Sequence, residues 1–417
     1  MIDYGDSFMK VLVIVGDCLT VNSSANLCHL AYIRGLVDCG NQVTVVSADS
    51  DNYSHDRSMI IPSGTKNYFY DGITLYEKFS KKKSNNASDI KTEVKTNTDK
   101  KTDTISLRSK VINIIKSGII SLYGPHGVYS KIVKTAQQFR SDEEYDYVLS
   151  ISTPPSGHLL AHNLLKTKHI KAKHWIQIWE DPWFGDAYGF NNKRSMFQEE
   201  KRLLVFAEKV CYVSPLTLKN RQILFPESAD KMYWQPLPYY YKNDTDEKVV
   251  FYNNHYGYFG DYAPISRNLK PFYESAKQCG INVNICGSPN NLFLATEQIH
   301  IYPRLPLNKL KPIEDRTNVL IFLCNRKGGQ IPGKIYQYSA TYKTILFILD
   351  GTDEEKRVLK EYFQKFNRYV FCENTVEDIT RAIKDIESGN IGDVVNEPIE
   401  AFNPKETVKK ILACENG

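Results

Sequence analysis

The chain has 417 residues, of which 42% are hydrophobic and 12% aromatic, with a formal net charge of +5 at pH 7. A chain of this length is too long to pack around a single hydrophobic core, so we expect two globular domains. The net charge is small for this length and does not indicate a nucleic-acid-binding protein. The nine cysteines are scattered without a C-x-x-C pair, which favours reduced thiols in the cytoplasm and disfavours zinc. The apolar runs are short, so we expect no signal peptide and no membrane-spanning helix.

The first half of the chain alternates short apolar runs with helical patterns. Lys10–Gly16 predicts a buried strand, Asn26–Val37 a helix and Gln42–Ser47 the next strand, which is typical of a doubly wound sheet. The loop before the helix lacks the G-x-G-x-x-G of dinucleotide sites, so a nicotinamide or flavin cofactor is disfavoured. Its small residues let a ligand approach the backbone, although Ser24 and Asn26 could equally be ordinary helix caps.

A lysine-rich segment interrupts this half of the chain. Lys78–Thr104 contains eight lysines and four acidic residues and is low in complexity, which predicts a mobile insertion at about 78–104. The following Ile105–Tyr123 places apolar residues on one helical face with basic residues nearby, which predicts an amphipathic helix at about 105–123. Such a helix suits an anionic membrane surface, and its apolar face equally suits the core of the first domain.

Acidic residues follow one of the middle strands. The strands expected in this region are Asp146–Ser150, His174–Trp179 and Lys209–Ser214. Glu180 and Asp181 come directly after the second of them. Carboxylates at the carboxyl end of a parallel strand lie where open α/β sheets bind ligands. Asp181 could also cap the turn that follows it.

We place the domain boundary after a proline- and tyrosine-rich stretch that ends near residue 240. This gives an N-terminal domain over 1–240, a C-terminal domain over 248–395 and a last helix within 396–417, which could pack back on the first domain. The elements expected to open the second half are a strand, a loop and a helix, at Val249–Tyr252, Gly257–Pro264 and Ile265–Gln278.

The most informative stretch is 318–351, which predicts strand, loop, helix and strand. The loop Cys324–Gly333 contains three glycines, a proline and two basic residues, and Lys334 opens the expected helix Lys334–Tyr342. Backbone N–H groups at a helix start have no internal partner, and the helix dipole there favours an anion. The stretch therefore predicts a phosphate-binding corner, with an ordinary loop and a surface lysine as the alternative.

Five motifs occur along the chain: VNSSAN, STPPSGH, WEDPW, GYFGDYAPISRN and QIPGKIYQYSATYKTIL. In this order they resemble the GT-B glycosyltransferases, and more narrowly the family 4-type enzymes that build bacterial capsule, exopolysaccharide or O-antigen. The resemblance implies an α/β fold of two Rossmann-like doubly wound domains that face a cleft. The C-terminal domain would bind a nucleotide-sugar donor and the N-terminal domain a lipid-linked glycan acceptor, with retention of anomeric configuration and no essential metal.

The resemblance also implies roles for particular residues. The implied donor site consists of Gly260, Arg267, Gly287, Gln330, Gly333, Lys334, Gln337 and Tyr338, and the implied acceptor side of Ser24, Asn26 and Ser156. Arg267 and Lys334 would contact the donor diphosphate and stabilise the charge that develops on it. Asp181 or Glu180 would orient the acceptor hydroxyl or accept its proton, so these four are the catalytic candidates.

Two positions depart from the family. Gly329 and Gln337 stand near the places where many relatives carry the two glutamates of an E-x7-E pair. An amide at 337 could still contact a ribose diol, whereas Gln330, Ile331 or a backbone group would have to replace the first carboxylate. Two alternatives to a transferase therefore stay open, namely a non-catalytic nucleotide-sugar-binding partner of another transferase and a GT-B-fold sugar-nucleotide epimerase.

A catalytic metal is not expected. The two D-x-D sequences, Asp49-Ser50-Asp51 and Asp244-Thr245-Asp246, lie at an early strand end and in the expected linker. No histidine between 158 and 174 belongs to an H-E-x-x-H arrangement. We expect no cofactor besides the donor substrate, and a cytoplasmic protein peripheral to the inner face of the membrane, where lipid-linked acceptors and anionic lipids lie.

Overall fold

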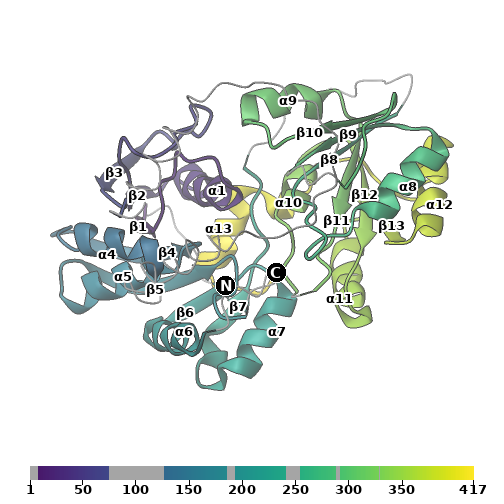
Figure 1. Cartoon of the computed structure of the whole chain (residues 1–417). Coiled ribbons are helices and arrows are strands. Elements are labelled where there is room, and N and C mark those ends of the chain that lie inside the picture. Colours follow the sequence, from purple (N-terminus) through teal and green to yellow (C-terminus); the bar gives the residue numbers. More distant parts are fainter. Residues whose placement is uncertain (1–7, 75–125, 186–192, 241–253, 288–291, 328) are drawn as a thin grey trace, which may run out of the picture.

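The computed structural model describes residues 8–74, 126–185, 193–240, 254–287, 292–327 and 329–417. These residues form two parallel α/β sheets that lie beside each other (Figure 1). Three of the expected features lie outside the described residues: the insertion at 78–104, the amphipathic helix at 105–123 and the strand Val249–Tyr252.

The first sheet has seven parallel strands in the order β3-β2-β1-β4-β5-β6-β7. Its strands are β1 (Lys10–Val15), β2 (Gln42–Ala48), β3 (Thr65–Tyr70), β4 (Glu144–Ser152), β5 (Lys171–Trp179), β6 (Lys209–Tyr212) and β7 (Met232–Trp234). This order is that of a doubly wound sheet, in which β1 lies at the point where the winding direction reverses. The central β1 is almost wholly buried because helices cover both of its faces, whereas edge strand β3 has no fully buried residue.

The second sheet has six parallel strands in the equivalent order, β10-β9-β8-β11-β12-β13. Its strands are β8 (His255–Phe259), β9 (Asn282–Cys286), β10 (Ile299–Tyr302), β11 (Val319–Leu323), β12 (Thr344–Leu349) and β13 (Tyr369–Glu373). The prediction that a loop begins at Gly257 was wrong, because Gly257 lies within β8. A Cβ on Gly257 would come within 2.5 Å of the Phe259 ring, so this glycine serves packing within a strand.

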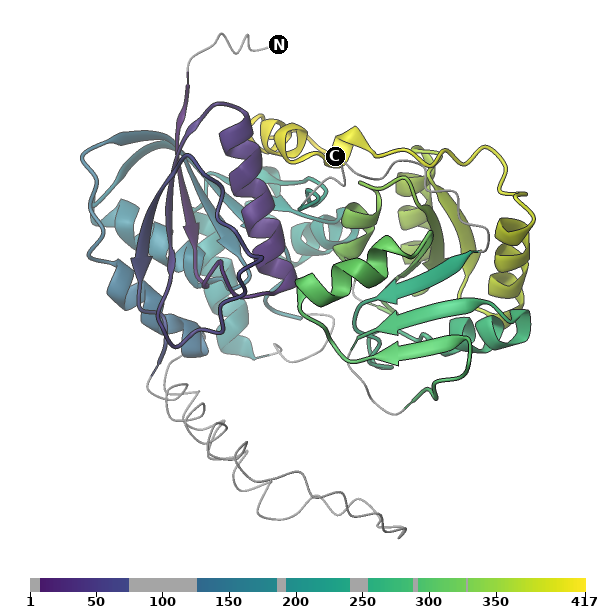
Figure 2. The ribbon, with the colours of Figure 1, turned by 90° about the horizontal axis from the view of Figure 1, so that it is seen from above.

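Helices cover both faces of each sheet (Figures 1 and 2). Those of the first half are α1 (Ser24–Asp38), α4 (Ser130–Ala136), α5 (Ser156–Lys166), α6 (Arg194–Phe206) and α7 (Pro215–Leu224). Those of the second half are α8 (Lys270–Cys279), α9 (Leu307–Asp315), α10 (Lys334–Tyr338), α11 (Asp353–Gln364), α12 (Val376–Glu387) and α13 (Pro404–Leu412). Short 3-10 segments occur at Gly127–Tyr129, Pro226–Lys231 and Glu400–Phe402.

The C-terminal segment returns to the first sheet, where α13 lies against α1 (Figure 2). The two helices approach closely because Gly35 of α1 has no side chain: a Cβ there would lie 2.3 Å from the carbonyl oxygen of Pro404. The Tyr233 hydroxyl donates to the carbonyl of Ile411 at 2.7 Å, and the Gln235 amide donates to that of Glu415 at 2.7 Å. The chain end is thereby fixed to the first half.

One continuous hydrophobic cluster joins the two halves. It contains side chains of the first sheet such as Ile176 and Tyr233, and side chains of the second sheet such as Phe322 and Phe347. Leu237, in the segment that leaves β7, belongs to the same cluster. The two sheets are therefore held by shared apolar packing as well as by the chain that connects them.

Candidate active site

A cavity of about 500 Å³ opens where the carboxyl ends of both sheets meet. Loops after β1 and β5 supply its first wall, and loops after β8, β9, β10 and β11 supply the opposite wall. Its polar and glycine lining consists of Asn22, Ser24, Glu180, Asp181, Tyr258, Gly260, Asp261, Arg267, Gly287, Arg304, Asn325, Gln330, Gly333, Lys334 and Tyr338. Open α/β sheets bind ligands at this edge.

The structure brings most of the predicted site residues together in this cavity. From the first half they are Ser24, Glu180 and Asp181, and from the second half Gly260, Arg267, Gly287, Gln330, Gly333, Lys334 and Tyr338. Three predicted residues, Asn26, Ser156 and Gln337, are not in its lining. The cations thus face the carboxylates across the boundary between the two sheets.

Arg267 is held in place by two hydrogen bonds. Its Nε donates to Asn325 Oδ1 at 2.9 Å, and its Nη1 donates to the carbonyl of Asp261 at 3.1 Å. Both partners lie in loops at carboxyl ends of strands, Asp261 after β8 and Asn325 after β11. A guanidinium has five N–H donors, so these two bonds orient the group while leaving donors for an anionic ligand.

Lys334 forms an ion pair within the cavity wall. Its Nζ lies 3.1 Å from Glu314 Oε1, and the Glu314 side chain is only 12% exposed. The ammonium also lies 5.8 Å from the centre of the Tyr338 ring, on the same short helix. An ammonium has three N–H donors, so the ion pair positions the charge without using all of its hydrogen-bonding capacity.

Helix α10 is shorter than predicted, because it ends at Tyr338 and not at Tyr342. The hydroxyl of Ser339 donates to the carbonyl of Ile335 at 2.7 Å, and that of Thr341 donates to the carbonyl of Tyr338 at 2.8 Å. Side-chain bonds of this kind compete with helix continuation. A helix of 5 residues has only a small dipole, so the anion-binding argument now rests on the side chains of Lys334 and Arg267.

Glu180 pairs with His29 of α1 beneath the cavity. The His29 Nε2 and Glu180 Oε2 atoms lie 3.3 Å apart, and the two side chains are 0% and 6% exposed. Burial is the largest single influence on the pKa of His29 and lowers it, but the charge and hydrogen bond of Glu180, together with Asp17 and the Ser152 backbone, outweigh burial and raise that pKa. Burial raises the pKa of the Glu180 carboxyl, partly offset by His29. The pair therefore holds protons more tightly than either isolated side chain would.

Asp181 differs from its neighbour because it is exposed. Its Oδ1 accepts a hydrogen bond from the Gln330 side-chain amide, which belongs to the opposite half of the chain. Both candidate carboxylates line the cavity, and Asp181 is the more accessible of the two to an acceptor hydroxyl.

The backbone explains the missing acid at position 329. Gly329 has a φ of +67°, and a Cβ there would lie 2.8 Å from Leu216 Cβ. Its carbonyl accepts a hydrogen bond from the Ser214 hydroxyl at 2.6 Å, so α7 of the first half closes over this loop. A glutamate would be strained and obstructed at this position.

Gln337 is turned away from the cavity. Its Oε1 accepts a hydrogen bond from the backbone N–H of Tyr240 at 3.0 Å, so the amide contacts the segment that leaves the first domain. The structure does not support the ribose contact predicted for Gln337, because its carbonyl oxygen holds the connecting chain. The periodicity of the sequence could not reveal this distant partner.

Asn26 and Ser156 are both fully buried, at 0% exposure. The Asn26 amide donates to the carbonyls of Cys18 at 2.8 Å and Val21 at 2.9 Å, and so holds the β1–α1 loop. A Cβ on Gly16 would lie 2.2 Å from Ser156 Oγ, which places that serine beneath β1. The acceptor-side roles predicted for these two residues are therefore not supported, and Ser24 alone of the three lines the cavity.

Several residues of the site were not predicted. Arg304 follows β10 and Glu314 lies on α9, and neither element was expected from the sequence. Asn325 lies two residues after the end of strand β11, so its place at a carboxyl strand end was a usable signal. His29 was hidden within a helical pattern, because only the fold brings it to Glu180.

No protein-family profile and no curated protein matches the sequence. Solved structures match almost the whole chain. A glycosyltransferase from Rickettsia africae ESF-5 has a TM-score of 0.51 and 12% identity, with 98% of this chain and 98% of that chain covered. A UDP-N-acetylglucosamine 2-epimerase has a TM-score of 0.51 and 10% identity, with 97% of this chain and 94% of that chain covered.

The chain has the GT-B fold. This confirms the predicted architecture of two Rossmann-like domains that face a cleft. The two neighbours differ in the reactions that their names state, so the similarity extends to the fold and not to the chemistry. Among the described helices, none has the length and apolar character needed to cross a bilayer.

Proposed function

We propose that the protein is a glycosyltransferase that moves a sugar from a nucleotide-sugar donor to a saccharide acceptor. The observation that carries this proposal is the arrangement of charge across one cavity. Arg267 and Lys334 line the wall of the second sheet, and Asp181 lines the wall of the first. A donor diphosphate suits the cationic wall, and an acceptor hydroxyl suits the carboxylate.

The cations would act on the leaving group. Cleavage of the donor leaves negative charge on its β-phosphate, and Arg267 and Lys334 would stabilise that charge. Each preorganised donor of this kind typically contributes about 3 kcal/mol to the transition state. Glu314 keeps the Lys334 ammonium oriented before the donor arrives. Retention of anomeric configuration and independence of a metal belong to this proposal.

The carboxylates would act on the acceptor. Asp181 is exposed and would orient the attacking hydroxyl or accept its proton. Glu180 is buried against His29, so it acts by holding the end of β5 and the neighbouring Asp181 in place. Ser24, at the start of α1, lies on the same wall and would contact the acceptor.

The acceptor that fits the proposal is a lipid-linked glycan in bacterial surface polysaccharide synthesis, as in family 4-type enzymes. Its support is the ordered set of motifs, together with the basic segment Lys78–Thr104. Lipid-linked acceptors lie at the cytoplasmic face of the membrane, and basic segments bind anionic lipids there. The protein would then be cytoplasmic and peripherally bound.

Steady-state transfer by Lys334→Ala and Arg267→Ala tests the diphosphate assignment. We expect each substitution to lower kcat/KM about 100-fold, since loss of about 3 kcal/mol corresponds to roughly two orders of magnitude. Lys356→Ala is the matched control, because Lys356 pairs with Asp353 and Glu373 away from the cavity. Near-normal transfer by both cavity variants would contradict the assignment.

A sugar-nucleotide epimerase is the second candidate. The observation that favours it is the convergence of His29, Glu180 and Asp181 at one wall, since a carboxylate and a histidine can move a proton on a sugar. His29 does not line the cavity, which places it behind Glu180. Incubation with nucleotide sugars and no acceptor distinguishes the candidates: an epimerase yields an isomeric nucleotide sugar, and a transferase leaves the sugar configuration unchanged.

A non-catalytic binding partner is the remaining alternative, and the glycine at 329 favours it, because no carboxylate can point from there toward the donor sugar. Such a protein would bind nucleoside diphosphates and transfer nothing. Transfer activity of the unsubstituted protein above that of Lys334→Ala would exclude a non-catalytic partner.

A further inference from the structure

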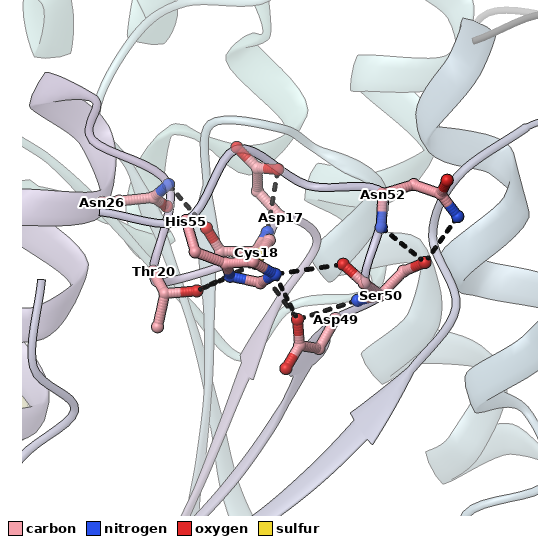
Figure 3. A network of polar contacts seen from close by, with 8 residues as sticks. All are labelled: Asp17, Cys18, Thr20, Asn26, Asp49, Ser50, Asn52 and His55. Atoms are coloured by element: carbon pink, nitrogen blue, oxygen red, sulfur yellow. Dashed lines mark hydrogen bonds and ion pairs between the residues drawn. The ribbon is translucent and has the colours of Figure 1, made fainter. Parts of the chain in front are cut away.

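Three side chains of types that can bind a metal ion converge at the β1–α1 loop, outside the candidate active site (Figure 3). Cys18 lies just after β1, Asp49 directly follows β2, and His55 lies in the loop beyond it. One ligand atom from each residue, a thiol sulfur, a carboxylate oxygen and a ring nitrogen, lies within 4.8 Å of both others. Cys18 is 1% exposed, whereas the Asp49 and His55 side chains are 36% and 39% exposed.

The spacing of the ligand atoms fits a tetrahedral ion. Cys18 Sγ lies 3.6 Å from Asp49 Oδ1, and His55 Nε2 lies 3.7 Å from the same oxygen. Around a tetrahedral zinc ion, with a Zn–S bond of about 2.3 Å and Zn–N and Zn–O bonds of about 2.0 Å, such atoms are roughly 3.3–3.6 Å apart. Two of the three spacings therefore fit a bound ion, and the third, between Cys18 Sγ and the His55 ring, lies within 4.8 Å.

Neighbouring groups already orient two of the ligands. His55 Nδ1 lies 2.7 Å from the Thr20 hydroxyl, which holds the ring with Nε2 on the side of Asp49. The same Nε2 also lies 3.1 Å from the Ser50 carbonyl, a contact that ion binding would replace. Asp49 Oδ1 accepts a hydrogen bond from the Ser50 backbone N–H at 2.8 Å. Supporting contacts of this type fix ring orientation and ligand direction at metal sites. Thr20 also lies 3.3 Å from Cys18 Sγ, so one hydroxyl supports two ligands.

We propose that Cys18, Asp49 and His55 bind one zinc ion, with water as the fourth ligand. A thiolate, an imidazole and a carboxylate together suit zinc, whereas magnesium and calcium prefer oxygen ligands alone. Binding replaces the thiol S–H bond by a zinc–sulfur bond and releases the proton to solvent. The ion cross-links the ends of β1 and β2.

This position gives the ion a structural role at the wall of the cavity. Asn22, in the loop that Cys18 begins, lines the cavity and also donates to Asp56 Oδ2 at 2.8 Å. By anchoring Cys18 and His55, the ion would fix the two segments that this hydrogen bond joins, and would so hold the β1–α1 loop at the acceptor side of the cavity. The sequence disfavoured zinc because the ligands are dispersed along the chain, and only the parallel pairing of β1 with β2 brings them together.

Titration of the full-length protein with Zn²⁺, in competition with a chromophoric chelator, tests the proposal without any nucleotide sugar. We expect one equivalent to bind, and Cys18→Ser, Asp49→Asn and His55→Gln each to abolish measurable binding. Thr20→Val, which removes no ligand, should weaken affinity about 10- to 100-fold. Cys279→Ser and His174→Gln are matched controls outside the cluster and should bind as the unsubstituted protein does.

Co²⁺ substitution checks the ligand set directly. We expect a thiolate-to-cobalt charge-transfer band in the unsubstituted protein and in Cys279→Ser, and its loss in Cys18→Ser. Circular dichroism of each variant shows whether it is folded. Failure of the unsubstituted protein to compete for Zn²⁺, or equal binding by the three ligand variants and the two controls, would overturn the proposal. Because no sugar is used, failure here leaves the proposed transferase activity untouched.

Discussion

Gly329 illustrates how one backbone angle decides which side chain a site can have. Gly329 and Gly389 both have a positive φ, +67° and +73°, but only Gly329 faces a neighbour, since nothing lies within 4 Å of a Cβ on Gly389. We expect Gly389→Ala to cost roughly 1 kcal/mol of unfolding free energy through backbone strain alone. Gly329→Ala should cost about 1–3 kcal/mol more, because the new methyl group meets Leu216.

Urea denaturation of the two variants measures this difference. Equal midpoints for Gly329→Ala and Gly389→Ala would mean that the loop at 329 relaxes freely. A glutamate at 329 could then be accommodated, and its absence would need another explanation.

The buried His29–Glu180 pair predicts a particular pH dependence of stability. Folding raises the pKa of His29 above 6.5 and that of Glu180 above 4.5, so the folded state binds more protons than the unfolded state. The contribution of the pair is present at low pH and is lost as pH rises from the ordinary glutamate pKa through the raised histidine pKa. We therefore expect the unfolding free energy, relative to His29→Gln/Glu180→Gln, to fall as the pH rises above the ordinary glutamate pKa of 4.5 and to go on falling above the ordinary histidine pKa of 6.5. Parallel pH profiles for the unsubstituted protein and the double variant would contradict the raised pKa values of the pair.

At the scale of elements, the contact between α1 and α13 predicts an unusual response to alanine. Gly35→Ala would stabilise an isolated helix by roughly 1 kcal/mol, but here the methyl group meets the Pro404 carbonyl. We expect a net loss of about 1–3 kcal/mol and faster proteolysis after residue 403. Asp38→Ala, at an exposed position of the same helix, is the control and should change stability little. An increase in the unfolding free energy of Gly35→Ala would show that the position of α13 does not depend on the close approach of Gly35 to Pro404.

Elements with strong local signals were predictable. The bounds of β1 and β2 agree with the expected strands to within one residue, because an unbroken run of mostly apolar, β-branched residues forms each of them. The edge strands β3 and β10 were missed, since each is short and partly exposed. Helix α9 was also missed, because it contains a proline and no buried residue.

The candidate site was predictable where its residues come from strand ends and recognisable motifs. Asp181, Arg267 and Lys334 belong to this group and all line the cavity. Gln337 and Asn26 do not line the cavity, and each makes hydrogen bonds with backbone groups that only the folded chain brings close. Hydrogen bonds between residues far apart in the chain produce no periodic pattern in the sequence from which they could be predicted.

At the scale of the whole molecule, the shared hydrophobic cluster predicts that the two domains unfold together. All four tryptophans lie in the first half, so tryptophan fluorescence reports mainly on that half, although the Trp234 ring also packs against Tyr362 of α11, with the ring centres 4.8 Å apart. Arg368, in the second half, is 1% exposed and donates to the carbonyls of Thr341 at 2.8 Å and Lys343 at 2.6 Å. Arg368→Met leaves these carbonyls without that donor and should cost about 2–4 kcal/mol.

Because of the shared cluster, we expect this substitution to lower the midpoint of the tryptophan transition as well as that of circular dichroism. The exposed Arg357→Met, on α11 of the same half, is the control and should leave both midpoints unchanged. A tryptophan transition unaffected by Arg368→Met would show that the two domains unfold independently.

Binding of nucleoside diphosphates and nucleotide sugars, measured by thermal shift with calorimetric confirmation, tests the donor site most directly. We expect at least one member of a panel to stabilise the protein, by about 2.7 kcal/mol when present at 100 times its Kd. Lys334→Ala and Arg267→Ala should each lose most of this shift, while Lys356→Ala retains it. Absence of any shift with the unsubstituted protein, or equal shifts in all four proteins, would contradict a nucleotide-sugar site in the cavity between the two sheets.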